Sequence, residues 1–387
     1  MKVALVHDYL REYGGAERVL EVLHELFPAA PLYTAYFNPQ AMGHHGRKFA
    51  SWDIRTSWMQ KMPFANRLIS PFRVFAPLMF ESFDLSMYDL VISSSSAVYF
   101  AKSVLTQPGT LHLSYIHTPP RFLYGYTTSF NYKKNPITHV LAEVANHILR
   151  LYDFVLSQRP DILIANSQNV ARRIAKFYRR DSIVVYPPVD LAEFKSVRKT
   201  VGEYFLVLNR LVRGKGTETA VLACSKLGLA LKVAGSGPEL PNLKKLASKE
   251  VEFLGNVPDV ERVSLLAGAK ALIVCAEDED FGITPIEAQA AGTPVIAVAA
   301  GGFLETVIEG KTGRFFAKPK EKPSGKEYFS EEAVTNLVRV LEDFDPKDYR
   351  VDDCRKNAGR FSKERFKKEI LELIKKQGVK LDHARTT

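Results

Sequence analysis

The stretch EDEDFGITPIEAQAAGTPVIAV, residues 277–298, contains a turn, a helix and a strand in direct succession. Phe281–Gly282 close a loop, and the residues after them predict a helix that begins near Ile283. The run PVIAVA at 294–299 then predicts a buried strand. Helices that alternate with short apolar strands are typical of a parallel sheet built from strand–helix–strand units.

The same alternation extends through both halves of the 387-residue chain. A chain of this length usually forms two cores, because single cores stop growing near ~250–300 residues. The paired prolines Pro187–Pro188 and the polar stretch after them predict the domain boundary. Strands are predicted at 2–7, 89–95, 112–117 and 161–167, then at 204–210, 230–235, 251–255, 270–276 and 294–299, and an amphipathic helix at 16–27.

We therefore expect an α/β protein of two Rossmann-like, doubly wound parallel-sheet domains facing a central cleft. The first domain is expected to span 1–190 and the second 201–360. Residues 361–387 are expected to form a helix and tail that pack back on the first domain. Ligands of such sheets bind beyond the carboxyl ends of the strands, so the active site is expected between the domains.

Composition excludes several classes of protein. Three cysteines without CxxC spacing suggest neither a disulfide framework nor a zinc site. The apolar run before His7 is too short for a signal peptide, and no run approaches the ~20 apolar residues that cross a bilayer. A cytoplasmic location is expected. The net charge of +10 alone suggests nucleic-acid binding, but no nucleic-acid-binding motif accompanies it, so none is expected.

One basic segment, Arg47–Arg73, has six basic residues against a single acid, with aromatic residues between them. That mixture suits peripheral contact with an anionic membrane. A merely solvated basic face is the alternative. The basic residues are Arg47, Lys48, Arg55, Lys61, Arg67 and Arg73, and the acid is Asp53.

The most specific chemical signal is a pair of carboxylates, Glu279 before the predicted helix and Glu287 on its second turn. Glu279 can accept hydroxyls of a sugar and Glu287 those of a ribose, while N–H groups at Gly282–Thr284, with Ile283 between them, meet phosphate oxygens. Phe281 belongs to the same loop. Two alternatives are an acidic surface loop and an Asp-x-Asp metal site. We favour donor binding and expect no metal or other cofactor.

Two further loops carry candidate residues. Arg210 and Lys215 follow the first strand of the second domain, where permanent cations would neutralise a leaving diphosphate. Gly14–Gly15 precede a helix, where backbone N–H groups can approach an anion, although a plain turn is equally compatible.

His117 follows a predicted strand and precedes Pro119–Pro120, a stiff turn that holds the ring near the strand end. A histidine there can hydrogen-bond a donor hydroxyl or stabilise charge that develops at the sugar. His7, at the end of the first strand, is a weaker candidate. A purely structural role is the alternative for both.

With these residues in hand, the sequence resembles the retaining glycosyltransferases of family 4, which have the two-domain GT-B fold. The resemblance implies an acceptor-binding first domain and a second domain that binds the nucleotide-sugar donor. It implies that Gly15, Arg210 and Lys215 lie at the donor phosphates, that Glu279 and Glu287 contact sugar and ribose, and that His117 lies beside the reacting sugar. The motifs that carry it are HDYL…GGAERV, DLVISSS, YIHTPPRFLY, ANSQNVARRI, VVYPPVD, NRLVRGKG, EDEDFGITPIEAQAAGTPVIA and GGFLETVIEGKTGRFF.

Within the family, the sequences of these motifs look most like those of bacterial and archaeal mannosyltransferases of O-antigen and related surface polysaccharides. This implies GDP-mannose as donor, a glycan or lipid-linked acceptor and an α-mannoside product. A UDP-sugar donor remains the alternative within this fold. A sugar-nucleotide epimerase is the alternative from another class, and it would turn over the donor without an acceptor.

Overall fold

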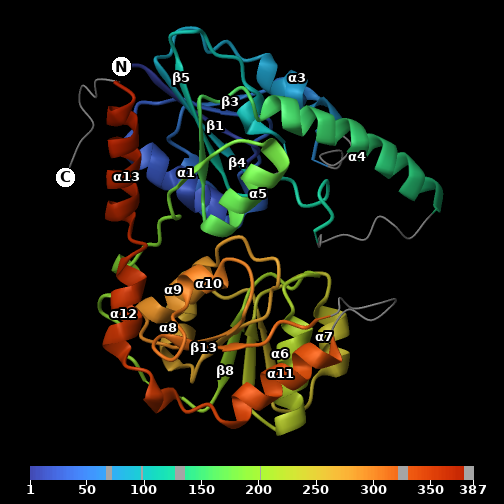
Figure 1. Cartoon of the computed structure of the whole chain (residues 1–387), viewed down its shortest axis with the longest axis vertical. Coiled ribbons are helices and arrows are strands. Elements are labelled where there is room, and N and C mark those ends of the chain that lie inside the picture. Colours follow the sequence, from blue (N-terminus) through green and yellow to red (C-terminus); the bar gives the residue numbers. More distant parts are fainter. Residues whose placement is uncertain (67–71, 97–98, 127–135, 201, 321–329, 379–387) are drawn as a thin grey trace. The chain divides into compact units, whose positions relative to one another are not determined.

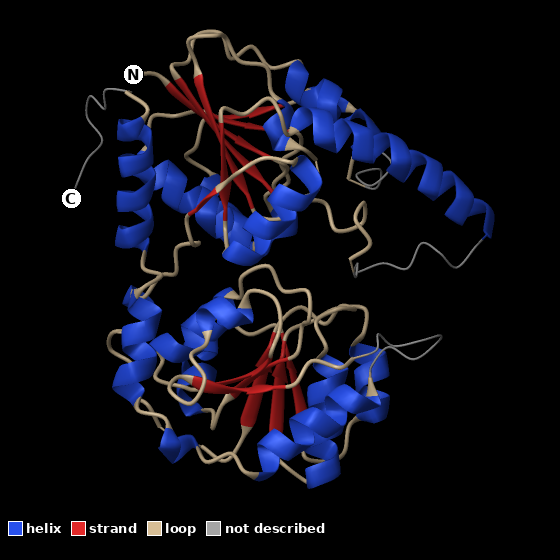
Figure 2. Ribbon diagram, in the orientation of Figure 1, coloured by secondary structure: helices blue, strands red, loops and turns tan. Residues whose placement is uncertain are grey.

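The structure is a computed structural model that describes residues 1–66, 72–96, 99–126, 136–200, 202–320 and 330–378, with the backbone alone at 136–141. The chain divides into two compact units, each with its own parallel sheet (Figures 1 and 2). Unit 1 contains the first part of the chain, as far as Pro188, and the last part, from Glu364 onward, whereas unit 2 spans Val189–Lys363. The predicted fold class, two Rossmann-like α/β domains with parallel sheets, is confirmed.

The sheet of unit 1 has the strand order β3-β2-β1-β4-β5-β6-β7 in the described part of the chain, and all the pairings are parallel. The four predicted strands are present, and three short strands were not predicted from the sequence. The strands are β1 (Val3–His7), β2 (Leu32–Thr34), β3 (Ile54–Thr56), β4 (Leu90–Ser95), β5 (Leu111–Ile116), β6 (Ile162–Ala165) and β7 (Ile183–Val184).

Helices cover both faces of this sheet because successive strand side chains point to opposite faces. Leu5 of β1 packs into one core with Leu20 and Phe366, whereas Val6 packs into another with Phe80 and Leu149. The C-terminal helix α13 therefore belongs to the core of unit 1 (Figure 1). The helices of this unit are α1 (Gly15–Leu26), α3 (Ala76–Glu81), α4 (Pro136–Leu156), α5 (Gln168–Tyr178) and α13 (Lys363–Lys376), with short 3-10 segments η1 (Gln40–Phe49), η2 (Trp58–Lys61), η3 (Arg73–Phe75) and η4 (Ala101–Ser103).

The sheet of unit 2 has the order β10-β9-β8-β11-β12-β13 in the described residues, again with parallel pairings. The strands are β8 (Phe205–Leu208), β9 (Leu231–Ala234), β10 (Val251–Gly255), β11 (Leu272–Val274), β12 (Val295–Val298) and β13 (Gly313–Phe316). The helices are α6 (Thr217–Leu227), α7 (Leu240–Leu246), α8 (Asp259–Gly268), α9 (Ile283–Ala290), α10 (Phe303–Thr306), α11 (Glu331–Glu342) and α12 (Val351–Gly359).

Each sheet has one point where the strand order reverses direction. It lies between β1 and β4 in unit 1 and between β8 and β11 in unit 2. Loops leave such a point on opposite faces of the sheet, and the crevice at the carboxyl ends of the two strands is where open α/β sheets bind ligands. The candidate residues fall largely at these two points.

Candidate functional site

The reversal point of unit 2 brings together a cation and a carboxylate that lie 64 residues apart in the chain. Lys215 lies in the loop after β8, and Glu279 lies in the loop between β11 and α9. The Lys215 Nζ atom lies 2.7 Å from Glu279 Oε2, and both side chains are partly buried. Arg210 lies in the Lys215 loop and is exposed. The structure thus places three predicted residues on the two adjacent loops where a ligand of this sheet would bind.

The loop that carries Glu279 is held by contacts on both sides. Phe281 is buried and packs edge-on against Phe361, with ring centroids 5.4 Å apart. Gly282 has a φ of 93°, which favours glycine, and it is the N-cap of α9. Helix α9 begins at Ile283, as the sequence predicted, so the N–H groups of its first turn open towards this loop.

Gly302, whose role the sequence did not reveal, holds the backbone of the loop that carries Glu279. The Gly302 N–H donates to the carbonyl oxygen of Glu279 at 2.9 Å. A Cβ atom at Gly302 would lie 2.4 Å from Phe281 Cα, so the backbones approach too closely for any other residue. The paired glycines 301–302 are the sequence signal that could have identified this contact.

Glu287 lies on α9 as predicted, but its partner was not predicted. Glu287 is almost fully buried, and Arg262 Nη1 of α8 donates to its Oε1 at 2.6 Å. Arg262 also contacts Glu193 and Asp259. A buried guanidinium therefore holds the carboxylate that was expected to bind ribose, and it fixes the orientation of that carboxylate.

In unit 1 the predicted histidine lies at the carboxyl end of β5. His117 is buried, its backbone N–H donates to the Ser95 carbonyl at 3.0 Å, and its Nε2 lies 2.9 Å from Ser94 Oγ. Burial, with a smaller contribution from His7, lowers the pKa of His117 to about 3. The ring is therefore neutral at pH 7, which leaves hydrogen bonding as its available chemistry.

The predicted glycine pair precedes α1, but its N–H groups are not all directed to a ligand. Gly15 is the first residue of α1, and the Gly14 N–H donates to Glu17 Oε2 at 2.7 Å. Glu17 Oε1 in turn lies 3.4 Å from His7 Nε2. For Gly14 the structure thus shows a protein carboxylate where the sequence suggested an anionic ligand.

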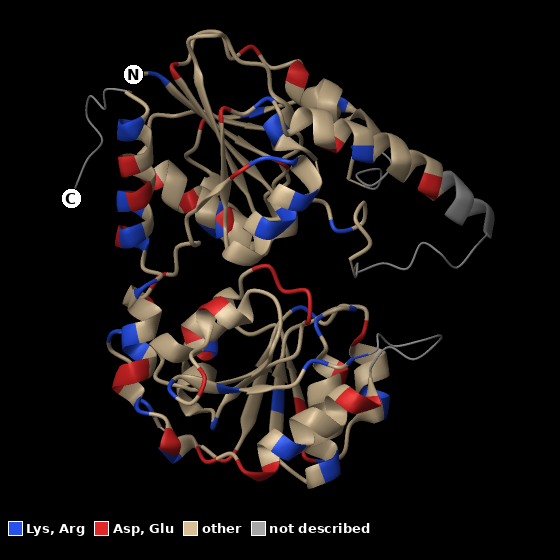
Figure 3. Ribbon diagram, in the orientation of Figure 1, with Lys and Arg blue, Asp and Glu red and all other residues tan. Residues whose placement is uncertain are grey.

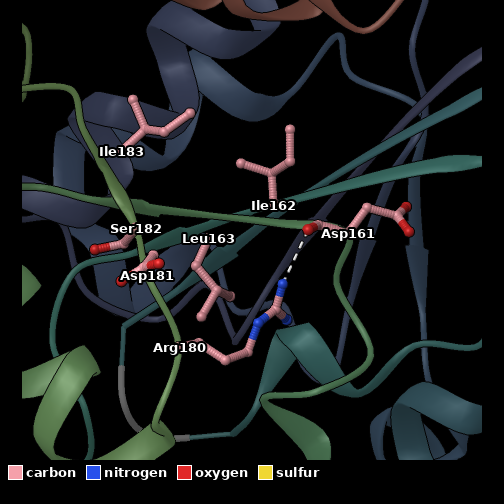
Figure 4. Close-up of a pocket in the computed structure, with 7 residues that line it drawn as sticks. All are labelled: Asp161, Ile162, Leu163, Arg180, Asp181, Ser182 and Ile183. Atoms are coloured by element: carbon pink, nitrogen blue, oxygen red, sulfur yellow. Dashed lines mark hydrogen bonds between the residues drawn. The ribbon is translucent and has the colours of Figure 1, made fainter.

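A cavity of about 300 Å³ lies in unit 1 at the amino end of β6, the edge of the sheet opposite His117 (Figure 4). Arg180, which lines it, donates to the carbonyl oxygens of Ser157, Pro160 and Asp161 at 2.6–2.9 Å. These bonds tie the segment before β7, which carries Arg180, to the loop before β6. None of the predicted site residues lines this cavity.

The basic segment is only partly available to a partner. Phe49 is buried in the core, Lys48 pairs with Glu21 at 3.3 Å, and Arg55 pairs with Asp53 at 2.8 Å. Arg67 lies outside the described residues. The exposed part is shorter and more apolar than the sequence suggested, with Trp58, Met62 and Phe64 on its surface.

Residues 189–326 match the family model described as "Glycosyl transferases group 1". The D-inositol 3-phosphate glycosyltransferase of Corynebacterium urealyticum is 27% identical over 281 residues, which are 61% of this chain and 64% of the relative. The Alpha-1,3/1,6-mannosyltransferase alg-2 of Neurospora crassa is 42% identical over 83 residues, which are 21% of this chain and 18% of the relative. The matches thus span less than two thirds of these relatives.

Over nearly the whole chain the fold is similar to that of solved GT-B glycosyltransferases. HepE of Anabaena, solved in complex with UDP-glucose, aligns over 97% of this chain and 100% of its own, with a TM-score of 0.68 and 18% identity. The chain therefore has the GT-B fold, and the match to the glycosyl transferases group 1 model lies within its second unit. Among the described residues no helix has the length and apolarity to cross a membrane.

Proposed function

We propose that the chain is a retaining glycosyltransferase that takes a sugar from a nucleotide donor held by unit 2. The observation that carries this proposal is the Lys215–Glu279 pair at the reversal point between β8 and β11, beside the N-terminus of α9. At this edge of the sheet a cation and the first-turn N–H groups of a helix suit the diphosphate of a nucleotide sugar, and a carboxylate suits its sugar hydroxyls.

The pair explains how the site distinguishes a sugar-bearing donor. An incoming diphosphate draws the Lys215 ammonium away from Glu279, and Arg210 adds a second permanent charge. Glu279 then accepts a hydroxyl of the donor sugar in place of Lys215. Glu287, oriented by Arg262, accepts a ribose hydroxyl.

His117 acts on the donor sugar as a neutral hydrogen-bonding group. Its lowered pKa, about 3, excludes a persistent imidazolium at pH 7. The proposal therefore gives it the role of binding a sugar hydroxyl while charge develops towards an oxocarbenium-like state. We expect His117→Ala and Glu279→Ala to lower the turnover of saturating donor far more than they change stability.

Calorimetry on Lys215→Met tests the donor site directly. Losing one charge-assisted contact of about 1.5–3 kcal/mol should weaken nucleotide-sugar binding roughly 10- to 150-fold. Lys270→Met is a matched control, because Lys270 pairs with Glu203 at 2.8 Å and is similarly exposed, but it lies at the amino end of β11. Equal donor affinity of the two variants would contradict the donor assignment.

The proposed transfer needs no divalent metal, since Lys215, Arg210 and the α9 N–H groups neutralise the diphosphate. Product formation should survive excess EDTA. A complete loss that Mg²⁺ or Mn²⁺ alone restores would point to the alternative metal site at Asp278 and Asp280. Donor consumption in the absence of any acceptor, with no free sugar released, would instead support an epimerase.

For the donor we propose GDP-mannose, which retention would convert into an α-mannoside on a glycan or lipid-linked acceptor. The mannosyltransferase activity named for the Neurospora relative supports this choice, whereas the UDP-glucose bound by HepE favours the alternative. Calorimetric titration with GDP-mannose, UDP-glucose and UDP-N-acetylglucosamine separates the two. Tighter binding of a UDP-sugar would overturn the mannose assignment, and a β-linked product, seen by NMR, would overturn retention.

The membrane contact predicted for Arg47–Arg73 is proposed to lie on a surface made by η2, η3, α3 and α4. Val144, Ile148, Leu151 and Val155 follow a helical spacing on α4 and are each 41–58% exposed. Few charged residues interrupt the described part of α4 (Figure 3). Phe75 and Leu78 are exposed on the neighbouring η3–α3 segment, while Phe80 of α3 and Leu149 of α4 share one core cluster. Trp58 is linked to Phe75 through the ring of Phe72, and Lys61 lies on the same segment η2 as Trp58. An exposed apolar face with a basic residue on such a segment suits an anionic bilayer that carries a lipid-linked acceptor.

Liposome sedimentation tests this contact. The wild type should pellet with anionic vesicles, and a Leu78→Ser, Leu151→Ser variant should not. Val260→Ser is the control, since Val260 is 82% exposed but belongs to unit 2. Equal pelleting of all three proteins, or none by the wild type, would exclude the proposed surface.

A further inference from the structure

A buried chain of hydrogen-bonding side chains connects the start of α1 with His117. Glu17 Oε1 lies 3.4 Å from His7 Nε2, His7 Nδ1 lies 3.1 Å from Ser94 Oγ, and Ser94 Oγ lies 2.9 Å from His117 Nε2. His7 and Ser94 are inaccessible to solvent, and Glu17 and His117 are nearly so. The chain crosses the reversal point of the unit 1 sheet, because His7 ends β1 and Ser94 lies near the end of β4.

We propose that Glu17, His7 and Ser94 are positioning residues that fix the ring of His117 and the nitrogen on which it carries its proton. This inference rests on the proposed function, in which His117 contacts the donor sugar. The three residues touch His117 or one another, and none of them is assigned a contact with the substrate.

The direction of each hydrogen bond follows from the one member that can only accept. The Glu17 carboxylate has no proton to give, so His7 Nε2–H donates to it. In the proposed arrangement His7 Nδ1 accepts from the Ser94 hydroxyl, and Ser94 Oγ accepts from His117 Nε2–H. This leaves Nδ1 of His117 as an acceptor for a sugar hydroxyl. Glu17 itself accepts from the Gly14 N–H at 2.7 Å, so the loop before α1 anchors the end of this hydrogen-bonded series that lies farthest from His117.

Ser93, the residue before Ser94 on β4, provides a matched control. Ser93 is as buried as Ser94, and its Oγ lies 2.9 Å from His112 Nε2, the same distance and the same ring nitrogen. Alternation along β4 sends Ser93 to the opposite face of the sheet, so its histidine is not in the chain to His117. Any general cost of deleting a buried serine hydroxyl should appear equally in both variants.

Kinetics separate the positioning role from a structural one. Ser94→Ala should lower kcat about 10- to 100-fold, by analogy with removal of the partner that orients a metal-binding histidine, with donor affinity unchanged by calorimetry. Ser93→Ala should keep kcat near the wild-type value. Glu17→Gln, which keeps an accepting oxygen, should retain more turnover than Glu17→Ala. Equal kcat values for Ser94→Ala and Ser93→Ala, or for Glu17→Gln and Glu17→Ala, would overturn the proposal.

Nitrogen-15 NMR of histidine-labelled protein tests the chain without any substrate. A slowly exchanging Nε2–H of His117 should be visible in the wild type and in Ser93→Ala, and it should be lost in Ser94→Ala. A wild-type His117 that is protonated at Nδ1, or whose Nε2–H survives in Ser94→Ala, would refute the chain. If the wild type transfers no sugar from any donor, the proposed function fails, and this spectrum still decides whether the chain positions His117.

Discussion

The buried Arg262–Glu287 pair allows a quantitative prediction about the stability of unit 2. Both side chains are less than 10% exposed, and Arg262 also contacts Glu193 and Asp259 and lies over the Phe194 ring. Removing one partner of a buried ion pair costs about 3–5 kcal/mol, because the remaining charge stays desolvated. Arg262→Met removes the guanidinium from all these contacts, so we expect it to lose about 4 kcal/mol.

The reverse change should cost less, because the partners are unequal. In Glu287→Gln the guanidinium keeps Glu193 and Asp259, so the loss should be near the ~2 kcal/mol of one charged hydrogen bond. With a urea dependence of about 2 kcal/mol per M, the midpoints should fall by roughly 2 M and 1 M. Combining Arg262→Met with Glu287→Leu should recover much of the loss, because no buried charge of the pair remains.

The assay can follow each unit separately. Both tryptophans of the chain, Trp52 and Trp58, belong to unit 1, so their fluorescence follows that unit while far-ultraviolet circular dichroism follows both. The Arg262→Met effect should appear in the dichroism transition of unit 2. Lys270→Met, which removes an exposed pair with Glu203, should cost only about 0–1 kcal/mol. An Arg262→Met loss no larger than that of Lys270→Met, or smaller than that of Glu287→Gln, would refute the reasoning.

Three further predictions use the same assays. Gly302→Ala would place a Cβ atom 2.4 Å from the backbone before α9, so it should cost about 1–3 kcal/mol and weaken donor binding, whereas Gly359→Ala, with open space around it, should be neutral or stabilising. Burial lowers the pKa of His112 and of His117 to about 3, whereas the unfolded chain takes up these protons below a pKa near 6.5. Unit 1 should therefore lose about 2 kcal/mol of stability for each histidine as the pH falls from 7 to 5, and a denaturation midpoint unchanged by pH would contradict this. Phe366→Ala should lower the stability of unit 1 by about 3–5 kcal/mol, although the residue lies at the far end of the chain, and an unshifted tryptophan fluorescence transition would count against that packing.

Much of the fold follows from local sequence patterns. Strands of four to six residues with a β-branched, apolar run, such as β4 and β12, were predicted, and so was the start of α9 at Ile283. The strands β2, β3, β7 and β13 were not predicted. Their two to four residues do not stand in a longer apolar run, whereas the three-residue strand β11 lies within the predicted run 270–276. The membership of the four unpredicted strands in their sheets depends on pairing with neighbours rather than on their own residues.

The contacts of the candidate site likewise differ in whether the sequence predicts them. The approach of Lys215 to Glu279 could be anticipated, because the loops after adjacent parallel strands emerge at one edge of the sheet. Arg262 could not, because nothing near it in the chain indicates that its guanidinium reaches Glu287, 25 residues later. The basic segment shows a related limit: alternation of basic and aromatic residues does not reveal that Phe49 is buried while Phe64 is exposed.

The Lys215–Glu279 pair also bears on selectivity, because each charge in the free protein already has a partner. In the proposed donor site, a nucleoside diphosphate without a sugar would draw Lys215 away from the partly buried Glu279 and offer that carboxylate no hydroxyl in exchange. A nucleotide sugar supplies a diphosphate for the lysine and a hydroxyl for the carboxylate at once. Under the proposed function, this pair therefore favours a donor that carries its sugar over the spent nucleotide, and release of the product nucleotide restores the original pair. A site built from an unpaired cation alone would have no such preference, since the diphosphate is common to both ligands.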